Sequence, residues 1–281
     1  MLSGLLGKLP PSARRAVLHA SGRFAPWEPG FDFTPPALRD GETAAPPDFV
    51  GIGAQKAGTT WWYSLLASHP AVTSRPEIHK ERHFFTRFGT DTFSQADVVA
   101  YHGWFPRSEG TIAGEWTPDY LSCPWVAPLL ARAAPDVRLL VLLRDPIDRF
   151  TSGVAHQIAN GSKPTADVLS DAINRGFYRR HLSWWMRHFA RDRLLVLQYE
   201  LCAKDPGGQL ARTYRFLGLD HDFRPPELRE RRSATTRPLF ASRDLVDRLR
   251  QVYAEDVADL MDCWPELDRS LWSTFDGALR A

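Results

Sequence analysis

The chain has 281 residues, of which 43% are hydrophobic and 24% charged, as is ordinary for a globular protein. This length suffices for one large domain with a substantial core. The formal net charge of +2 provides no bulk attraction for nucleic acid, so we expect no nucleic-acid partner. Any anion site must therefore come from a local basic cluster, and Arg231, Arg232 and Arg237 form one candidate.

The spacing of the cysteines and the lengths of the apolar runs indicate where in the cell the protein is expected. The three cysteines, Cys123, Cys202 and Cys263, resemble neither a metal site nor a disulfide framework, which favours a reducing compartment. No run approaches the ~20 apolar residues of a membrane span. Residues 1–20 lack a signal-peptide core and would allow at most weak peripheral contact with a membrane. We expect a cytoplasmic protein, and the Ala- and Arg-rich composition is typical of a bacterial one.

The first 46 residues read as an extension. Prolines recur there and break every candidate helix or central strand, as at Pro10, Pro26 and Pro35. We expect residues 1–46 to be a mobile extension and residues 47–281 to form a single domain. The sequence predicts no oligomeric state.

From residue 48 onward, short apolar runs alternate with helical patterns. Strands are expected at 48–53, 111–115 (weaker), 138–144 and 193–199, and helices at 59–68, 124–133, 147–160, 177–190, 206–217 and 242–263. Ser242 suits the N-cap of the last helix. The uniformly apolar run at 138–144 is typical of a central parallel strand that is covered on both faces. The pattern predicts an α/β fold, a P-loop-NTPase-like doubly wound parallel sheet flanked by helices. In such folds the ligand lies beyond the carboxyl ends of the strands.

A glycine-containing loop joins the first of these strands to the first helix. It reads Gly53-Ala-Gln55-Lys56-Ala57-Gly58-Thr59-Thr60-Trp61. Glycines allow a tight turn in which consecutive N–H groups face one anion, and the helix N-terminus adds partial positive charge. Lys56 adds a full charge, and Thr59 and Thr60 can donate hydroxyl groups.

This loop is not a Walker A sequence, which would read G-x-x-x-x-G-K-[ST]. Thr59 stands where that lysine belongs, and the lysine lies inside the loop as Lys56. The sequence offers no convincing set of magnesium ligands, so we expect no metal. An ATP-dependent kinase nevertheless remains one alternative, and a non-catalytic nucleotide-binding scaffold is another.

A second anion site is predicted after the most apolar strand. Arg144 closes that strand, Pro146 suits the start of a helix, and Ser152 follows near the second turn. An arginine fork with a hydroxyl makes a good phosphate clamp. The alternative is that Arg144 forms a structural ion pair with Asp145 or Asp148.

The two anion segments together resemble those of the sulfotransferases that use 3′-phosphoadenosine-5′-phosphosulfate (PAPS). The resemblance is strongest to the branch of heparan sulfate 3-O- and N-sulfotransferases and their bacterial relatives, and it covers residues 48–219. Four segments occur in that branch's order and approximate spacing: His69-Pro70, Glu81-Arg-His83-Phe84-Phe85, Thr117-Pro118-Asp119-Tyr120 and Arg144-Asp-Pro146. The resemblance implies the sulfotransferase fold, PAPS as co-substrate, and transfer to a hydroxyl or amine of a glycan or small-molecule acceptor.

The resemblance also implies roles for individual residues. Donor binding falls to Gln55, Lys56, Ala57, Gly58, Thr59, Thr60 and Trp61 for the 5′-phosphosulfate, to Arg144 and Ser152 for the 3′-phosphate, and to Tyr178 and Arg237 as flanking groups. Glu81 matches the catalytic base, His83 a nearby active-site residue, and Lys56 the group that stabilises the leaving phosphate.

Alternatives remain open for the base. Glu81 could instead be a surface carboxylate paired with Lys80 or Arg82, and His83 could be a packed histidine. Glu115, at a strand end, is the second candidate base.

Two positions depart from the branch. Trp116 replaces a frequent lysine, and Thr86 replaces an acidic residue. Both positions lie near the acceptor in the family. These departures argue against a highly anionic polymer such as heparan sulfate as the acceptor.

Overall fold

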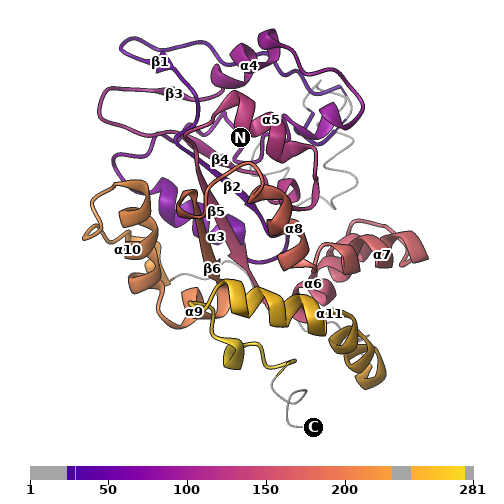
Figure 1. The fold of residues 1–281 in the computed structure, drawn as a ribbon. Coiled ribbons are helices and arrows are strands. Elements are labelled where there is room, and N and C mark those ends of the chain that lie inside the picture. Colours follow the sequence, from indigo (N-terminus) through magenta and orange to yellow (C-terminus); the bar gives the residue numbers. More distant parts are fainter. Residues whose placement is uncertain (1–23, 29, 230–241, 276–281) are drawn as a thin grey trace.

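The computed structural model describes residues 24–28, 30–229 and 242–275 (Figure 1). Within these residues a four-stranded parallel sheet forms the centre, in the order β4-β2-β5-β6. Its strands are β4 (Gly114–Trp116), β2 (Phe49–Gly53), β5 (Arg138–Leu143) and β6 (Leu194–Gln198). Two short strands, β1 (Thr43–Ala44) and β3 (Pro106–Arg107), pair antiparallel outside this sheet.

The central position of β5 follows from its sequence. This strand pairs with β2 on one side and with β6 on the other, both in parallel. Leu139 through Leu143 are fully buried, because both faces of the sheet are covered. On β2, Gly51 gives room for the ring of Trp116, since a Cβ atom there would lie only 2.0 Å from that ring.

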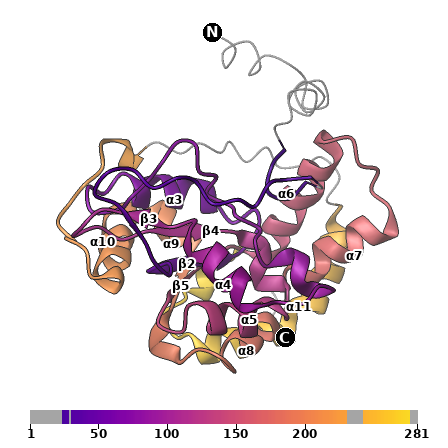
Figure 2. The same ribbon diagram turned by 90° about the horizontal axis from the view of Figure 1, so that it is seen from above.

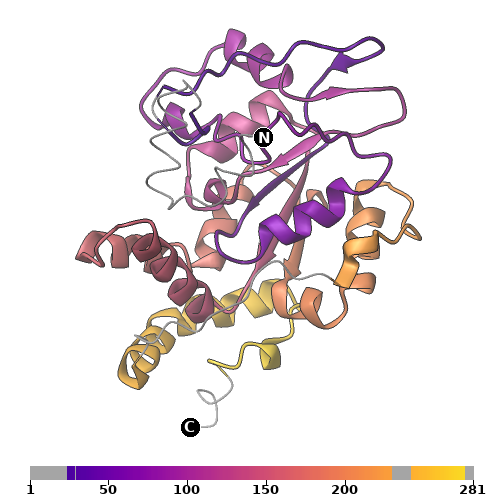
Figure 3. The ribbon, with the colours of Figure 1, turned by 180° about the vertical axis from the view of Figure 1, so that it is seen from behind.

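Helices lie on both sides of the sheet, as in a doubly wound fold. The helices are α3 (Thr59–Ala67), α4 (Gln95–His102), α5 (Val126–Ala133), α6 (Pro146–Ala159), α7 (Ala166–Asn174), α8 (Tyr178–Trp185), α9 (Tyr199–Lys204), α10 (Pro206–Leu217) and α11 (Arg243–Cys263). Short 3₁₀ turns occur at Thr86–Gly89, Pro118–Ser122, Arg191–Arg193, Pro226–Arg229 and Arg269–Leu271. Figure 3 shows α3 and α10 on the face of the sheet turned toward the viewer. In Figure 2, α10 and α7 lie at opposite ends of the molecule.

The predicted α/β fold is confirmed, and most predicted elements occur within two residues of their expected bounds. Two differ. The weak strand expected at 111–115 is displaced to Gly114–Trp116, and Ile112 forms only an isolated bridge to Val72. The helix expected at 177–190 ends at Trp185, after which Phe189 folds back to stack on the ring of Trp185. The helices α4, α7 and α9 were not predicted, and α9 follows β6 directly. As predicted, the hydroxyl of Ser242 caps α11 by accepting from the N–H of Leu245.

The described part of the expected N-terminal extension packs against the domain. Phe33 accepts a hydrogen bond from the indole of Trp104, and its ring packs edge-on against Phe84. Strand β1 adds backbone pairing to β3. Residues 30–46 therefore contact the domain in this structure, while the domain boundary after residue 46 stays a prediction.

Candidate active site

The loop between β2 and α3 has the geometry of an anion site. Gly58 is the N-cap of α3 and has a φ of 90°, which glycine adopts without steric cost. A Cβ atom at this position would also lie 2.8 Å from the ring of Tyr199. No side chain caps α3, so the N–H groups of its first turn remain for a ligand. The sequence prediction of an anion loop therefore agrees with the local conformation.

Lys56 is half-buried in this loop, with a φ of 66°. Burial lowers the pKa of its ammonium group, and the negative charges of Glu81 and Asp119 partly offset that effect. The lysine is therefore within electrostatic reach of both carboxylates. Of the neighbouring loop residues, Gln55 is half-buried and Thr60 is exposed. Three further candidates are buried, namely Ala57, Thr59 and Trp61.

Arg144 follows β5 and lies against the loop. Its Nη1 atom donates to the carbonyl oxygen of Lys56 at 3.4 Å, and its guanidinium carbon lies 5.1 Å from the ring centre of Tyr199. The alternative structural ion pair is present but long, with 3.7 Å between Nη2 and Oδ2 of Asp148. The carboxylate of Asp145 instead caps α6 and accepts hydrogen bonds from Thr274. The Nε atom of Arg144 is buried and has no partner among the described residues. Donor capacity is thus left for a ligand.

Ser152 and Tyr178 were predicted to accompany Arg144. Ser152 is half-buried on α6, the helix that starts directly beyond Arg144. Tyr178 is fully buried, and its hydroxyl donates to the carbonyl oxygen of Arg144 at 2.8 Å. Tyr178 therefore supports the backbone of the arginine from behind and exposes no surface that a nucleotide could touch.

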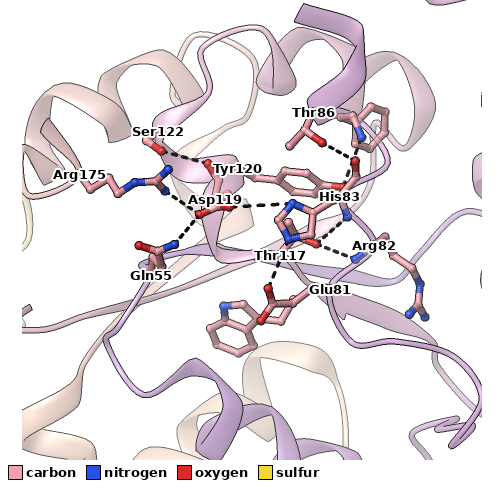
Figure 4. A network of polar contacts seen from close by, with 12 residues as sticks. Gln55, Glu81, Arg82, His83, Thr86, Thr117, Asp119, Tyr120, Ser122 and Arg175 are labelled. Carbon is pink, nitrogen blue, oxygen red and sulfur yellow. Dashed lines mark hydrogen bonds and ion pairs between the residues drawn. The ribbon is translucent and has the colours of Figure 1, made fainter. Parts of the chain in front are cut away.

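Glu81 and His83 form the centre of a polar network (Figure 4). The Oε2 atom of Glu81 lies 3.3 Å from Nε2 of His83, and its Oε1 atom accepts from the ammonium of Lys80 at 2.5 Å. Burial acts to raise the pKa of Glu81, but the hydrogen bond from His83 and the charge of Lys80 together lower it to about 2. Glu81 is thus paired with Lys80, as in the first alternative from the sequence, but it is half-buried and not a surface group. His83 is buried, as in the alternative of a packed histidine, and it also faces Glu81.

Asp119 connects the loop between β2 and α3 to this network. Its Oδ1 atom accepts from the side-chain amide of Gln55 at 3.2 Å and from Nη1 of Arg175 at 2.6 Å. Its Oδ2 atom lies 3.9 Å from Nδ1 of His83. Through these contacts the segment after β4 is bonded to the loop between β2 and α3 and lies against the imidazole of His83 (Figure 4).

Glu115, the second candidate base, is fully buried. Its carboxylate accepts from the hydroxyls of Tyr101 and Thr117, at 2.8 and 2.5 Å, and burial raises its pKa. A group without accessible surface cannot meet an acceptor, so the geometry favours Glu81. Trp116 is likewise fully buried, and its indole donates to the carbonyl oxygen of Gly53 at 3.1 Å. Trp116 therefore does not face an acceptor, contrary to the expectation for this position.

Sequence reasoning gave no role to Asp119 or Arg175, and it did not single out His156 or Trp27. Asp119 was visible within the Thr-Pro-Asp-Tyr segment, but only the fold brings it to His83. His156 lies one helical turn after Ser152 on α6, and the charges of Lys56 and Glu81 both act on its pKa, which burial lowers. Its spacing of four residues from Ser152 places both side chains on the same face of the helix, and this pattern can be read from the sequence. Trp27 offered none, because it lies in the proline-rich segment.

The predicted basic cluster of Arg231, Arg232 and Arg237 lies outside the described residues. Among the residues that are described, no group of three or more His, Cys, Asp or Glu side chains is placed to hold a metal ion. None of the described helices is both long and apolar enough to cross a lipid bilayer.

Comparison with known proteins agrees with the fold and the site. A family model described as a sulfotransferase domain matches residues 46–236. Heparan sulfate glucosamine 3-O-sulfotransferase 3A1 of Mus musculus is 30% identical over 188 residues, which cover 62% of this chain and 46% of that protein. Heparan sulfate glucosamine 3-O-sulfotransferase 6 of Homo sapiens is 28% identical over 239 residues, which cover 78% of this chain and 66% of that protein. The chain thus spans about half the length of the first of these relatives.

Solved structures give the same fold. A crystal structure of a sulfotransferase from Alicyclobacillus acidocaldarius is similar with a TM-score of 0.64, at 24% sequence identity. The similarity covers 82% of this chain and 99% of that one. At this identity the comparison supports the fold alone, whereas the family model covers most of the chain. The chain belongs to the sulfotransferase family.

Proposed function

We propose that the chain transfers the sulfuryl group of PAPS to a hydroxyl or amine of a carbohydrate or small-molecule acceptor. The observation that carries this proposal is the meeting of three groups beyond the carboxyl ends of the strands. The guanidinium of Arg144 bonds to the backbone of Lys56, and the ammonium of Lys56 is within electrostatic reach of Glu81. An anion loop, a second cation and a carboxylate are what donor binding and proton removal require.

Donor binding is assigned to the two anion segments. The uncapped first turn of α3, with Lys56, Thr59 and Thr60, would hold the 5′-phosphosulfate. Arg144 and Ser152 would hold the 3′-phosphate, because the buried guanidinium retains unpaired donor capacity. Thr59 is buried and Thr60 exposed, so Thr60 has the more accessible hydroxyl.

The chemical step is an in-line displacement at sulfur. The acceptor oxygen forms a bond to sulfur while the bond from sulfur to the 5′-phosphate oxygen breaks. The acceptor proton passes to the carboxylate of Glu81, and the bond electrons leave with the 5′-phosphate of 3′-phosphoadenosine 5′-phosphate (PAP). Lys56 and the loop N–H groups stabilise the charge that develops on that leaving oxygen.

The low pKa of Glu81, about 2, is compatible with this role. Such a carboxylate is ionised at neutral pH and is therefore ready to accept a proton. It is a weak base, but the acceptor proton becomes strongly acidic once its oxygen is bonded to sulfur. Proton transfer late in the displacement therefore suits a carboxylate. His83 and Lys80 hold that carboxylate at 3.3 and 2.5 Å and so fix its position.

Calorimetric titration with PAP, AMP and Mg-ATP, each with and without EDTA, tests this proposal. We expect PAP to bind tightly and equally well in EDTA, and radiolabelled PAPS then to transfer sulfuryl to an acceptor. A preference for Mg-ATP would indicate a kinase instead. Absence of binding to all three nucleotides would indicate a scaffold that has lost its chemistry.

A further inference from the structure

A hollow of about 330 Å³ lies between the N-terminal segment and the turn that follows His83. Its lining includes Trp27, Glu28, Phe31 and Phe33 from the N-terminal segment, with Thr86 and Arg87 from the turn. Nothing in the donor site accounts for this hollow.

Two lining residues contact His83 directly. The ring of Trp27 meets the ring of His83 edge-on, with 5.5 Å between the centres. The hydroxyl of Thr86 donates to the carbonyl oxygen of His83 at 2.6 Å. Because His83 in turn lies 3.3 Å from Glu81, its imidazole connects the lining of the hollow to the proposed base.

Trp27 has an unusually open position for a tryptophan. It is 51% exposed, although most of the other tryptophans in the described residues are buried. Its ring is held by edge contacts with His83 and with His79, the latter at 5.2 Å. An exposed aromatic ring beside a base offers a surface on which a flat ring can stack.

The charges around the hollow do not favour an anion. Glu28 and Arg87 are the ionisable groups among the described residues that line it. Arg87 lies 3.5 Å from Asp97 and packs against the rings of Phe33 and Phe84, while its buried Nε atom has no hydrogen-bond partner among the described residues. The described lining thus holds one cation and one carboxylate and offers a sulfated chain no excess of positive charge.

We infer that this hollow is the acceptor subsite, and that it takes an uncharged hydroxyl compound with a flat ring, stacked on Trp27. An aryl ring and the apolar face of a sugar ring share this chemistry. The inference rests on the proposed function, because it places the acceptor beside Glu81.

The test begins with PAP binding, which checks the donor site independently of the acceptor. PAP-saturated protein is then titrated with phenol, methyl β-D-glucoside and a heparin octasaccharide. The first two probes separate an aryl ring from a glycoside, and the third represents an anionic polymer. Transfer from radiolabelled PAPS gives KM and kcat for each bound probe.

Trp27→Ala is the decisive variant, and Trp27→Phe keeps a ring at the same place. Leu38→Ala is the matched control, because Leu38 is a 50% exposed apolar residue of the same segment outside the hollow. We expect Trp27→Ala to raise the Kd and KM of a neutral probe about tenfold and leave PAP binding unchanged. Trp27→Phe should retain most of the affinity, and Leu38→Ala all of it.

Three outcomes would overturn the inference while leaving the donor site intact. The protein could bind PAP but neither neutral probe, it could prefer the heparin octasaccharide, or Trp27→Ala could bind the neutral probe as well as the unaltered protein does. Failure to bind PAP would instead contradict the proposed function. Normal PAP binding by Trp27→Ala shows that the variant is folded.

Discussion

The Nδ1 atom of His83 faces the carboxylate of Asp119, with 3.9 Å between Nδ1 and Oδ2. The opposite ring nitrogen faces Glu81, so the imidazole stands between two carboxylates. Asp119 also accepts a hydrogen bond from Gln55 in the loop between β2 and α3. One side chain therefore links the loop between β2 and α3 to the imidazole that faces Glu81.

Asp119→Asn is expected to slow transfer roughly ten- to a hundredfold. The substitution removes the negative charge that faces the His83 ring, so that His83 and Glu81 shift from their positions. The ¹⁵N chemical shifts of the His83 ring should move in the same variant. Asp171→Asn is the matched control, since Asp171 also binds Arg175, at 2.7 Å, but is not among the groups that contact His83. Unchanged His83 resonances in Asp119→Asn would show that Asp119 does not position the imidazole.

Glu81→Gln should keep PAP binding and lose transfer by roughly 10²–10⁴-fold, since an amide cannot accept the acceptor proton. Single-turnover transfer from radiolabelled PAPS measures this loss. Glu77→Gln changes an exposed carboxylate of the same segment and should have little effect. If Glu81→Gln retained near-normal turnover, another group would be the base.

Arg144→Ala should weaken PAP binding by roughly ten- to a hundredfold and affect AMP much less, because AMP lacks the 3′-phosphate. Calorimetric titration with both nucleotides measures the ratio of the two dissociation constants. Arg138→Ala is the control at the other end of β5, where Arg138 bonds to the carbonyl oxygen of Leu217. A PAP-to-AMP preference that survives in Arg144→Ala would remove the arginine from the 3′-phosphate site.

Glu200 gives a prediction about stability and pH. Burial raises the pKa of its carboxyl group to about 7, against the lowering effect of the hydrogen bond from the N–H of Asp145. A raised pKa in an acid means that the folded state prefers the protonated form. The contribution of Glu200 to the free energy of unfolding is therefore complete below pH ~4.5, the ordinary pKa of a glutamate carboxyl group. It declines as the pH rises toward 7.

Between pH 5 and 8 this decline amounts to about 3 kcal/mol of unfolding free energy at most. Glu200→Gln cannot ionise, so it should lose this pH dependence. Its single amide oxygen can replace only one of the two oxygens that accept from Trp272 and Asp145, so its stability should also be lower by a constant amount at every pH. Urea unfolding of both proteins at several pH values measures the difference. If the unfolding free energies of the two proteins changed with pH in the same way, Glu200 would not have a raised pKa.

The sequence by itself determined the fold class and the two anion segments. The apolar run from Arg138 to Leu143 required a covered strand, and the glycine at position 58 required a turn into a helix. These features depend on residues close together in the chain, so periodicity and spacing suffice to locate them. Lys56 and Arg144 could be placed at strand ends for the same reason.

Only the tertiary structure decided which polar groups face a ligand. Glu115 and Trp116 lie at a strand end as expected, yet packing buries both, while Asp119 three residues later reaches the phosphate loop. Trp27 reaches His83 from a segment that the prolines made unreadable. These contacts join residues dozens of positions apart. Their burial and direction are set by close packing between elements, a property that no local pattern contains.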